Sequence, residues 1–349
     1  METTTTLLTP LLGMTLEQLQ SLVTELGMPR FSAGQICRWL YEKRVTGIDE
    51  MTDLSKANRD KLSAAYQVGR FAPSHSAGSK DGTVKYLFPS GDDGMAVECV
   101  YIPDDDRATL CISTQRGCKM GCRFCMTGKQ GYHGSLTAHE IMNQVLSIPH
   151  ADKLTNVVFM GMGEPLDNVD AVLQAITIMT AKWGFAWSPK RITVSTVGIL
   201  PGLKRLLDET SVHVAISVHS PYHEERLSLM PAEKAFPLKQ VFALLSQYDF
   251  RHQRRLSAEY IMWDGVNDDD AHAEALAKIL KPAAARVNLI RFHSIPGVNL
   301  HTADDDRMTH FRDLLNSHGI ICTIRQSRGE DIAAACGMLA GKTSGNKNS

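Results

Sequence analysis

From about residue 107 the sequence alternates short apolar runs, rich in residues that favour β-strands, with stretches of helical apolar period. The runs that predict strands are TLCIST (109–114), NVVFMG (156–161), RITVST (191–196), VHVAISVHS (212–220), SAEYIMW (257–263), RVNLIRF (286–292) and ICTIR (321–325). Helices are predicted between them, for example at 170–182, 271–280 and 304–317. This alternation indicates a parallel sheet with right-handed crossovers. About six such units predict an α/β fold, a full or partial barrel of the TIM type, with its active site at the carboxyl ends of the strands.

Two smaller regions precede the predicted barrel. Residues 1–75 contain short amphipathic helices and predict a small helical domain. Residues 76–106 contain TVKYLFPSGDDGMAVECVYIP, two β-rich runs around a turn sequence, and predict a β-hairpin linker. The barrel would then span 107–341, and the polar tail 342–349 is expected to be disordered.

Bulk composition excludes some classes of protein. Hydrophobic residues make up 43% and charged residues 21% of the chain, values typical of a globular protein. No apolar run is long enough to span a bilayer, and the start METTTT lacks the basic and apolar regions of a signal peptide, so we expect a cytoplasmic chain without a membrane partner. Because cytosolic disulfides are rare, clustered cysteines there indicate metal binding or catalysis.

The sequence GCKMGCRFCMTGKQG, which starts at Gly117, holds three of the chain's eight cysteines: Cys118, Cys122 and Cys125. Structural zinc sites usually combine two close pairs of ligands, and no second pair follows here, although a distant ligand could complete one. A four-iron cluster is normally held by four thiolates. Three protein thiolates would leave one iron open for another ligand.

This spacing, together with FCMTGKQG and the barrel that follows, resembles the radical S-adenosylmethionine (SAM) enzymes. The likeness extends to FMGMGEPLDN, SPKRITVSTVG, AISVHSP, LMPAEKAFP, EYIMWDGVND, VNLIRFHSIPG and IRQSRGEDIAAACGML, which resemble the RlmN family of dual-specificity RNA methyltransferases. The resemblance implies a [4Fe–4S] cluster, two SAM molecules per turnover, and methylation of adenosine C2 in 23S rRNA and in certain tRNAs. A Cfr-type enzyme that methylates adenosine C8 of rRNA is the close alternative. A zinc-stabilised RNA-binding module without catalysis is an alternative from a different class.

The resemblance also assigns three catalytic residues. Cys336 matches the cysteine that carries the methyl group, and Cys111 matches the cysteine that resolves the protein–RNA link through a disulfide. Glu98 matches the proposed proton acceptor. Considered alone, the two cysteines could be packing residues and Glu98 could be exposed on the hairpin, although a carboxylate buried in an apolar strand would need a partner.

Contacts to SAM are predicted at the ends of the strands. The matching residues are Gly163, Glu164, Ser195, Ser217, Val218, His219 and His293. At the last of these positions the family commonly has asparagine, but a histidine ring can also form hydrogen bonds.

The expected partners are RNA and an electron donor. Since the formal net charge is −1, RNA binding requires a local basic surface, for which RHQRR (251–255), SPKR (188–191) and RQSRG (325–329) are candidates. The resemblance implies that residues 1–75 are an accessory RNA-binding domain and that a protein such as flavodoxin or ferredoxin supplies electrons. We expect a monomer, and we expect Cys37, Cys99 and Cys322 to be packing residues.

Overall fold

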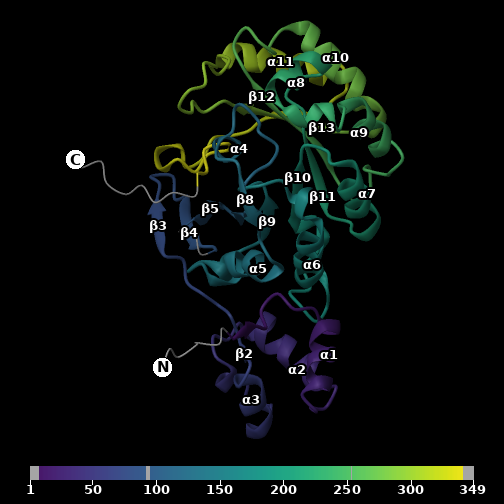
Figure 1. Cartoon of the computed structure of the whole chain (residues 1–349). Helices are drawn as coiled ribbons and strands as arrows, with labels where there is room; N and C mark the ends of the chain where they lie inside the picture. The colour runs from purple at the N-terminus through teal and green to yellow at the C-terminus, as the bar shows by residue number, and fades with distance from the viewer. Residues whose placement is uncertain (1–7, 92–94, 253, 341–349) are drawn as a thin grey trace, which may run out of the picture.

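The computed structural model describes residues 8–91, 95–252 and 254–340 (Figure 1). The expected tail at 342–349 lies outside these ranges. In Figure 1 the amino-terminal helices lie at one end of the molecule, beneath the helices α5 and α6 of the larger α/β part.

The amino-terminal part is helical, as predicted. Its elements are α1 (Leu16–Glu25), α2 (Ser32–Cys37), a π-helix (Arg38–Lys43), a 3₁₀ turn (Ile48–Glu50) and α3 (Lys56–Ser63). A capping box starts α1, because the side chains of Thr15 and Gln18 each accept a hydrogen bond from the backbone of the other. The short strands β1 (Thr9–Pro10) and β2 (Tyr66–Gln67) pair in parallel and bring the two ends of this part together.

One ten-stranded sheet organises the described residues of the larger part, in the order β14-β13-β12-β11-β10-β9-β6-β5-β4-β3. The parallel strands are β6 (Arg107–Cys111), β9 (Asn156–Phe159), β10 (Ile192–Thr196), β11 (His213–Ser217), β12 (Leu256–Met262), β13 (Arg286–Arg291) and β14 (Cys322–Ile324). Each coincides within a few residues with a predicted strand.

Helices connect successive parallel strands. They are α5 (Ala138–Ser147), α6 (Val169–Thr180), α7 (Leu200–Glu209), α8 (His223–Leu229), α9 (Leu238–Leu245), α10 (Asp270–Leu280) and α11 (Asp305–Ser317). Their apolar sides pack with one face of the strands in the main core, which includes Leu206 of α7, Val241 of α9 and Val194 of β10. The α/β partial barrel predicted from the alternating sequence is therefore confirmed.

The expected hairpin is part of the same sheet. Strands β4 (Val84–Pro89) and β5 (Ala96–Asp104) are antiparallel, β5 pairs with β6, and β3 (His75–Gly78), which the sequence did not predict, adds the edge strand. The segment after β14 crosses this antiparallel region, since Gly329 N–H donates to Asp81 (3.0 Å) and Lys85 Nζ donates to the carbonyl of Ala333 (3.3 Å). These contacts return the C-terminal residues to the edge of the barrel that starts with β6.

The inner face of the barrel carries polar residues. Cys111, Val158, Thr193 and His213 are in register on neighbouring strands and therefore share one face. Further along the same face, Glu259 of β12 accepts hydrogen bonds from Ser257 and from Asn288, whose β13 is paired with β12 (2.8 Å each). A polar interior leaves this face available for polar ligands.

Among the helices of the described ranges, none combines the length and the apolar character needed to cross a bilayer.

Candidate active site

The three clustered cysteines lie in a loop after β6, at the carboxyl ends of the parallel strands. A two-stranded ribbon closes the loop at its base: β7 (Gln115–Gly117) pairs with β8 (Tyr132–Ser135), and the N–H of Cys118 donates to the carbonyl of Gly131 (2.8 Å). Gly117 has a φ of +70°, and a Cβ there would lie 1.8 Å from the Gly131 oxygen. Only glycine fits this position, so the ribbon and the loop depend on it.

The donor set of this loop fits a cluster with one open iron. All three thiols are partly buried, and Cys122 and Cys125 pack against a small apolar cluster that includes Phe124 and Trp263. In the described part of the chain, no three His, Cys, Asp or Glu side chains converge closely enough to hold a single metal ion. Three thiols spread along one loop suit a cubane, which binds each thiolate at a different iron, better than a single zinc ion.

Burial keeps these thiols protonated in the absence of metal. It raises the pKa of Cys118 to about 12, and the nearby carboxylates Glu164 and Asp167 add to the shift. Iron ions would supply the positive charge that a buried thiolate needs, so cluster binding would release protons. Cys118, Cys122 and Cys125 are the residues that would hold the cluster.

The turn after β9 places Gly163 and Glu164 beside the loop. Gly163 has a φ of +95°, and a Cβ there would lie 2.5 Å from Cβ of Gln115. The buried Glu164 carboxylate accepts from the N–H of Leu166 (3.0 Å) and of Val197 (2.9 Å), which ties the end of β9 to the end of β10. Burial nevertheless raises its pKa to about 7. A carboxylate held in this way gains stability from a cationic ligand such as an ammonium group.

Four of the residues predicted to contact SAM lie at the ends of β10 and β11, and they differ in burial and in free hydrogen-bonding groups. Ser195 and Ser217 are half-buried at the strand ends. Val218 is fully buried. Its N–H donates to the Glu259 carbonyl (3.0 Å), and its carbonyl accepts from Arg226 Nε (3.1 Å). Val218 therefore has an apolar side chain in the core and both backbone polar groups already in hydrogen bonds.

His219 is a neutral hydrogen-bond donor. Its backbone adopts a left-handed conformation (φ +59°), and its Nδ1 accepts from the N–H of Ile261 (3.1 Å), which leaves the proton on Nε2. Burial lowers its pKa to about 3. The ring meets the edge of Phe124 (4.8 Å between centroids), so it contacts the cysteine loop directly.

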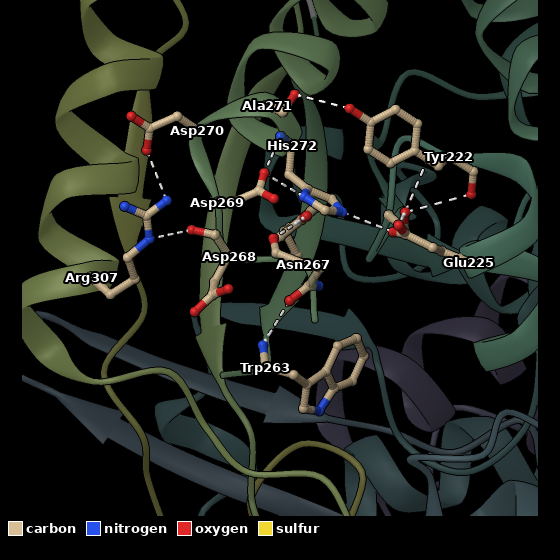
Figure 2. Close-up of polar contacts among 12 residues, drawn as sticks. Tyr222, Glu225, Trp263, Asn267, Asp268, Asp269, Asp270, Ala271, His272 and Arg307 are labelled. Carbon is tan, nitrogen blue, oxygen red and sulfur yellow. Dashed lines mark hydrogen bonds and ion pairs between the residues drawn. The ribbon is translucent and has the colours of Figure 1, made fainter. Parts of the chain in front are cut away.

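A polar network behind β11 and β12 supports this position (Figure 2). The fully buried side chain of Asn267 donates to the carbonyls of His219 (2.6 Å) and Ile261 (2.7 Å) and accepts from the N–H of Trp263 (2.7 Å). Behind it, His272 is held between Asp269 (2.7 Å) and Glu225 (2.8 Å). The sequence analysis missed Asn267, because only its place in the DGVND segment, three residues before α10, distinguishes it from other asparagines.

A cavity of about 340 Å³ brings the two accessory cysteines together. Cys111 at the end of β6, Cys336 in the C-terminal segment and Cys125 of the cysteine loop all line it, as does His293. Hydrogen bonds fix the C-terminal segment to the loop, from Met126 N–H to the Gly337 carbonyl and from the Thr127 hydroxyl to the Leu339 carbonyl (2.8 Å each). The geometry thus gathers residues that lie far apart in the sequence.

The two accessory thiols have different surroundings. Cys336 is exposed, whereas Cys111 is buried, which raises its pKa to about 12. Arg325 follows β14 and lines the same cavity, and its pKa is raised by interaction with Cys336 first and then with Glu259 and Cys111. The sequence indicated the RQSRG segment as a basic surface, but not that its first arginine lies beside these thiols.

His293 and Glu98 lie at the margin of this arrangement. His293 is buried and is 3.4 Å from a carboxylate oxygen of Glu330, and it lines the cavity of Cys336. Glu98 shares a face of the sheet with Cys111, because Val100, two residues away, pairs with Cys111. Its carboxylate is buried, 3.5 Å from Lys85 Nζ, and accepts from the N–H of Ala340 (3.3 Å). Glu98 thus contacts the C-terminal segment but does not line the cavity.

The remaining cysteines are packing residues, as predicted. Cys37, Cys99 and Cys322 are all buried in the main hydrophobic core.

Comparisons with known proteins agree with this geometry. A family model described as ribosomal RNA large subunit methyltransferase N-terminal domain matches residues 9–68, and a radical SAM superfamily model matches residues 112–276. A solved radical SAM methyltransferase from Sphaerobacter thermophilus has a TM-score of 0.89 and 37% identity, covering 96% of this chain and 100% of its own.

Relatives of nearly full length define the family. A probable dual-specificity RNA methyltransferase RlmN from Bacteroides thetaiotaomicron is 61% identical over 331 residues, which are 95% of this chain and 96% of the relative. The dual-specificity RNA methyltransferase RlmN of Syntrophotalea carbinolica is 42% identical over 329 residues, 94% of this chain and 88% of the relative. These relatives favour neither the C8 enzyme nor the zinc-stabilised binding module. The chain belongs to the RlmN family of dual-specificity RNA methyltransferases, within the radical SAM superfamily.

Proposed function

We propose that this protein methylates C2 of adenosine in 23S rRNA, within the peptidyl-transferase region, and in certain tRNAs, next to the anticodon. The observation that carries the proposal is the single cavity lined by Cys111, Cys125 and Cys336. It combines a thiol of the cluster loop with two thiols that the cluster does not need. Membership of the RlmN family, rather than of a C8-methylating family, supports C2 as the target.

The cluster and SAM, when bound, supply a methyl group and the means to remove a hydrogen atom. Cys336 accepts the methyl group, so that a carbon–sulfur bond forms at Sγ and the thiol proton leaves. After one hydrogen atom is removed, the methylene carbon on Cys336 bonds to C2 of the adenine, which is too electron-poor to attack a methyl donor itself. Glu98 accepts the C2 proton of this adduct, and one electron passes to the bound cluster. The Cys111 thiolate then attacks Cys336 Sγ, so that a disulfide forms, the carbon–sulfur bond to the RNA breaks, and the released methylene carbon takes up a proton to become the methyl group. An external thiol reductant returns the two cysteines to the thiol state.

The SAM-side residues bind and orient in this proposal. Glu164 would accept from the SAM ammonium group, since its buried carboxylate gains stability from a cation. His219 would donate through Nε2, and Ser195, Ser217 and His293 would supply further hydrogen bonds. Glu164, His219 and His293 are buried, whereas the two serines are half-buried.

The partners follow from the chemistry. Domain boundaries at 75 and 106 would separate an accessory RNA-binding region from the hairpin and the catalytic barrel. We infer RNA substrates, a small electron-transfer protein such as flavodoxin or ferredoxin, a monomeric enzyme and a cytoplasmic location.

The test is anaerobic incubation of the cluster-loaded protein with SAM and RNA, followed by chromatography and mass spectrometry of the nucleosides. We expect 2-methyladenosine, and 8-methyladenosine would overturn the proposal. Cys336→Ala should abolish the protein-bound methyl group, and Cys111→Ala should trap a covalent protein–RNA adduct. Cys322→Ala is the matched control, a buried cysteine outside the cavity that should turn over normally.

A further inference from the structure

A separate cavity of about 470 Å³ opens at the amino-terminal ends of the parallel strands, the end of the barrel opposite to the cysteine loop. Arg107, His213 and Arg286 contribute to it from the first positions of β6, β11 and β13. Lys190 and residues 251–252 and 254–255 complete its wall. Two of the three basic segments recognised in the sequence therefore meet at this one place.

The lining of this cavity is strongly cationic. Its cations are Arg107, Lys190, Arg251, Arg254, Arg255 and Arg286, and neither aspartate nor glutamate lines it. Of these six, within the described ranges, Arg107 alone has an ion pair, with Asp104 (3.3 Å). The formal net charge of the chain is −1, so this local excess of cations arises from the way the fold gathers them.

The positive charges act on the same space. His213 Nδ1 accepts from the N–H of Arg255 (2.8 Å), and the pKa of His213 falls to about 4 through burial and the charges of Arg255, Lys190 and Arg286. Arg254 donates through Nη2 to the carbonyl of Leu207 (3.0 Å). Its Nη1 is buried and has no hydrogen-bond partner in the part of the chain that the structure describes. The site thus presents several cationic donors, and no carboxylate of the described residues lines it.

We propose that this amino-terminal cavity binds phosphate groups. Guanidinium groups match phosphate oxygens in geometry and in charge, and several of them around one cavity select anions with more than one charge. The phosphates could belong to the backbone of the RNA substrate or to a small free compound such as a diphosphate. Arg107 and Thr109 line both this cavity and the one of Cys336, so the two spaces adjoin along β6. The RNA source rests on the proposed function, whereas binding of a free phosphate does not.

The first experiment titrates inorganic pyrophosphate into the cluster-loaded protein by calorimetry, at constant ionic strength and under anaerobic conditions. Wild-type protein should bind it, and Arg255→Gln and Arg286→Gln should each weaken binding about tenfold, as expected for loss of a charged hydrogen bond. Arg312→Gln on the outer helix α11 makes the same change of charge away from the cavity and should bind like wild type. Arg286→Lys keeps the charge and should retain most of the affinity.

The second experiment measures the salt dependence of binding to an RNA hairpin that carries a substrate adenosine. If the bound phosphates are those of RNA, each Gln variant should reduce the slope of log K against log salt by about 0.7–0.9, and pyrophosphate should compete with RNA. If the ligand is a free compound, pyrophosphate binding should weaken in the variants while the RNA slope stays at the wild-type value. Equal pyrophosphate binding by wild type and both Gln variants, with an unchanged RNA slope, would overturn the proposal. Neither readout measures methylation, so failure here leaves the proposed reaction intact, and failure of methylation leaves the pyrophosphate result intact.

Discussion

Replacing Asn267 by alanine should weaken both the fold and the SAM site. The side chain is fully buried and makes hydrogen bonds of 2.6–2.7 Å with three backbone groups, those of His219, Ile261 and Trp263. Each typical hydrogen bond contributes about 1 kcal/mol net, and a buried group left without a partner costs about 1–3 kcal/mol. Loss of all three should therefore lower the free energy of unfolding by at least about 3 kcal/mol.

Asn267→Asp sharpens the test because it keeps the shape of the side chain. Two N–H donations would become contacts between a carboxylate and two carbonyl oxygens, so this variant should be no more stable than Asn267→Ala. The assay is anaerobic urea unfolding followed by circular dichroism at equal iron content, with calorimetry for SAM affinity. Asn299, exposed in the loop after β13, provides the control as Asn299→Asp, which should change stability by less than about 0.5 kcal/mol.

Measuring both stability and SAM affinity in the Asn267 variants shows whether this side chain stabilises the fold, the SAM site or both. A loss below about 1 kcal/mol in both Asn267 variants would refute the argument that this side chain holds the ends of β11 and β12 together. Intact SAM affinity in a destabilised variant would show instead that the His219 position does not depend on this network.

Three further outcomes follow from the same structure. Burial raises the pKa of Glu164 from 4.5 to about 7, so the SAM-free wild-type protein should lose stability as the pH rises through this range. The melting temperature of Glu164→Gln should therefore rise relative to that of wild type between about pH 5.5 and pH 8. A difference in melting temperature that stays constant over this range would contradict the argument. Gly117→Ala should sharply reduce the iron retained per chain, because its Cβ would lie 1.8 Å from the Gly131 oxygen. Gly131→Ala introduces a similar left-handed strain (φ +76°), but apart from its chain neighbours no atom lies within 4 Å of the added carbon, so it should retain much more iron; iron analysis checks both. Lys85→Met should lower the free energy of unfolding by about 3 kcal/mol, because it removes the cation next to the buried Glu98 carboxylate. In a double-mutant cycle measured by denaturation, adding Glu98→Gln should recover part of this loss. Additive losses in the two single variants would argue against coupling between the two side chains.

The barrel could be predicted because its strands are short runs rich in apolar and β-branched residues, separated by helical stretches. The run around Val194, for example, is rich in β-branched residues and buries alternate side chains, as a strand does. Strand β3 and the β7–β8 ribbon could not be predicted in the same way. They are short, polar and partly glycine, and they form because neighbouring chain segments offer free hydrogen-bonding edges.

The site was predicted in its parts but not in its arrangement. Cysteine spacing and family resemblance indicated Cys111, Cys125 and Cys336, yet their meeting in one cavity depends on a C-terminal segment of irregular backbone. Arg325 and Asn267 carry no local signal, because their importance comes from neighbours that are distant in the sequence. Glu98 contacts the C-terminal segment and lies outside the cavity, and no pattern in the sequence could predict this position.

The C-terminal segment also sets an order of events during synthesis. The hydroxyl of Thr127 and the carbonyl of Leu339 that bind each other are 212 residues apart, so the cysteine loop leaves the ribosome long before the segment that closes over it. Closing so long a loop late carries an entropic cost, which places this contact among the last to form. The three loop thiols therefore stay uncovered by this segment while the chain between Thr127 and Leu339 is being synthesised.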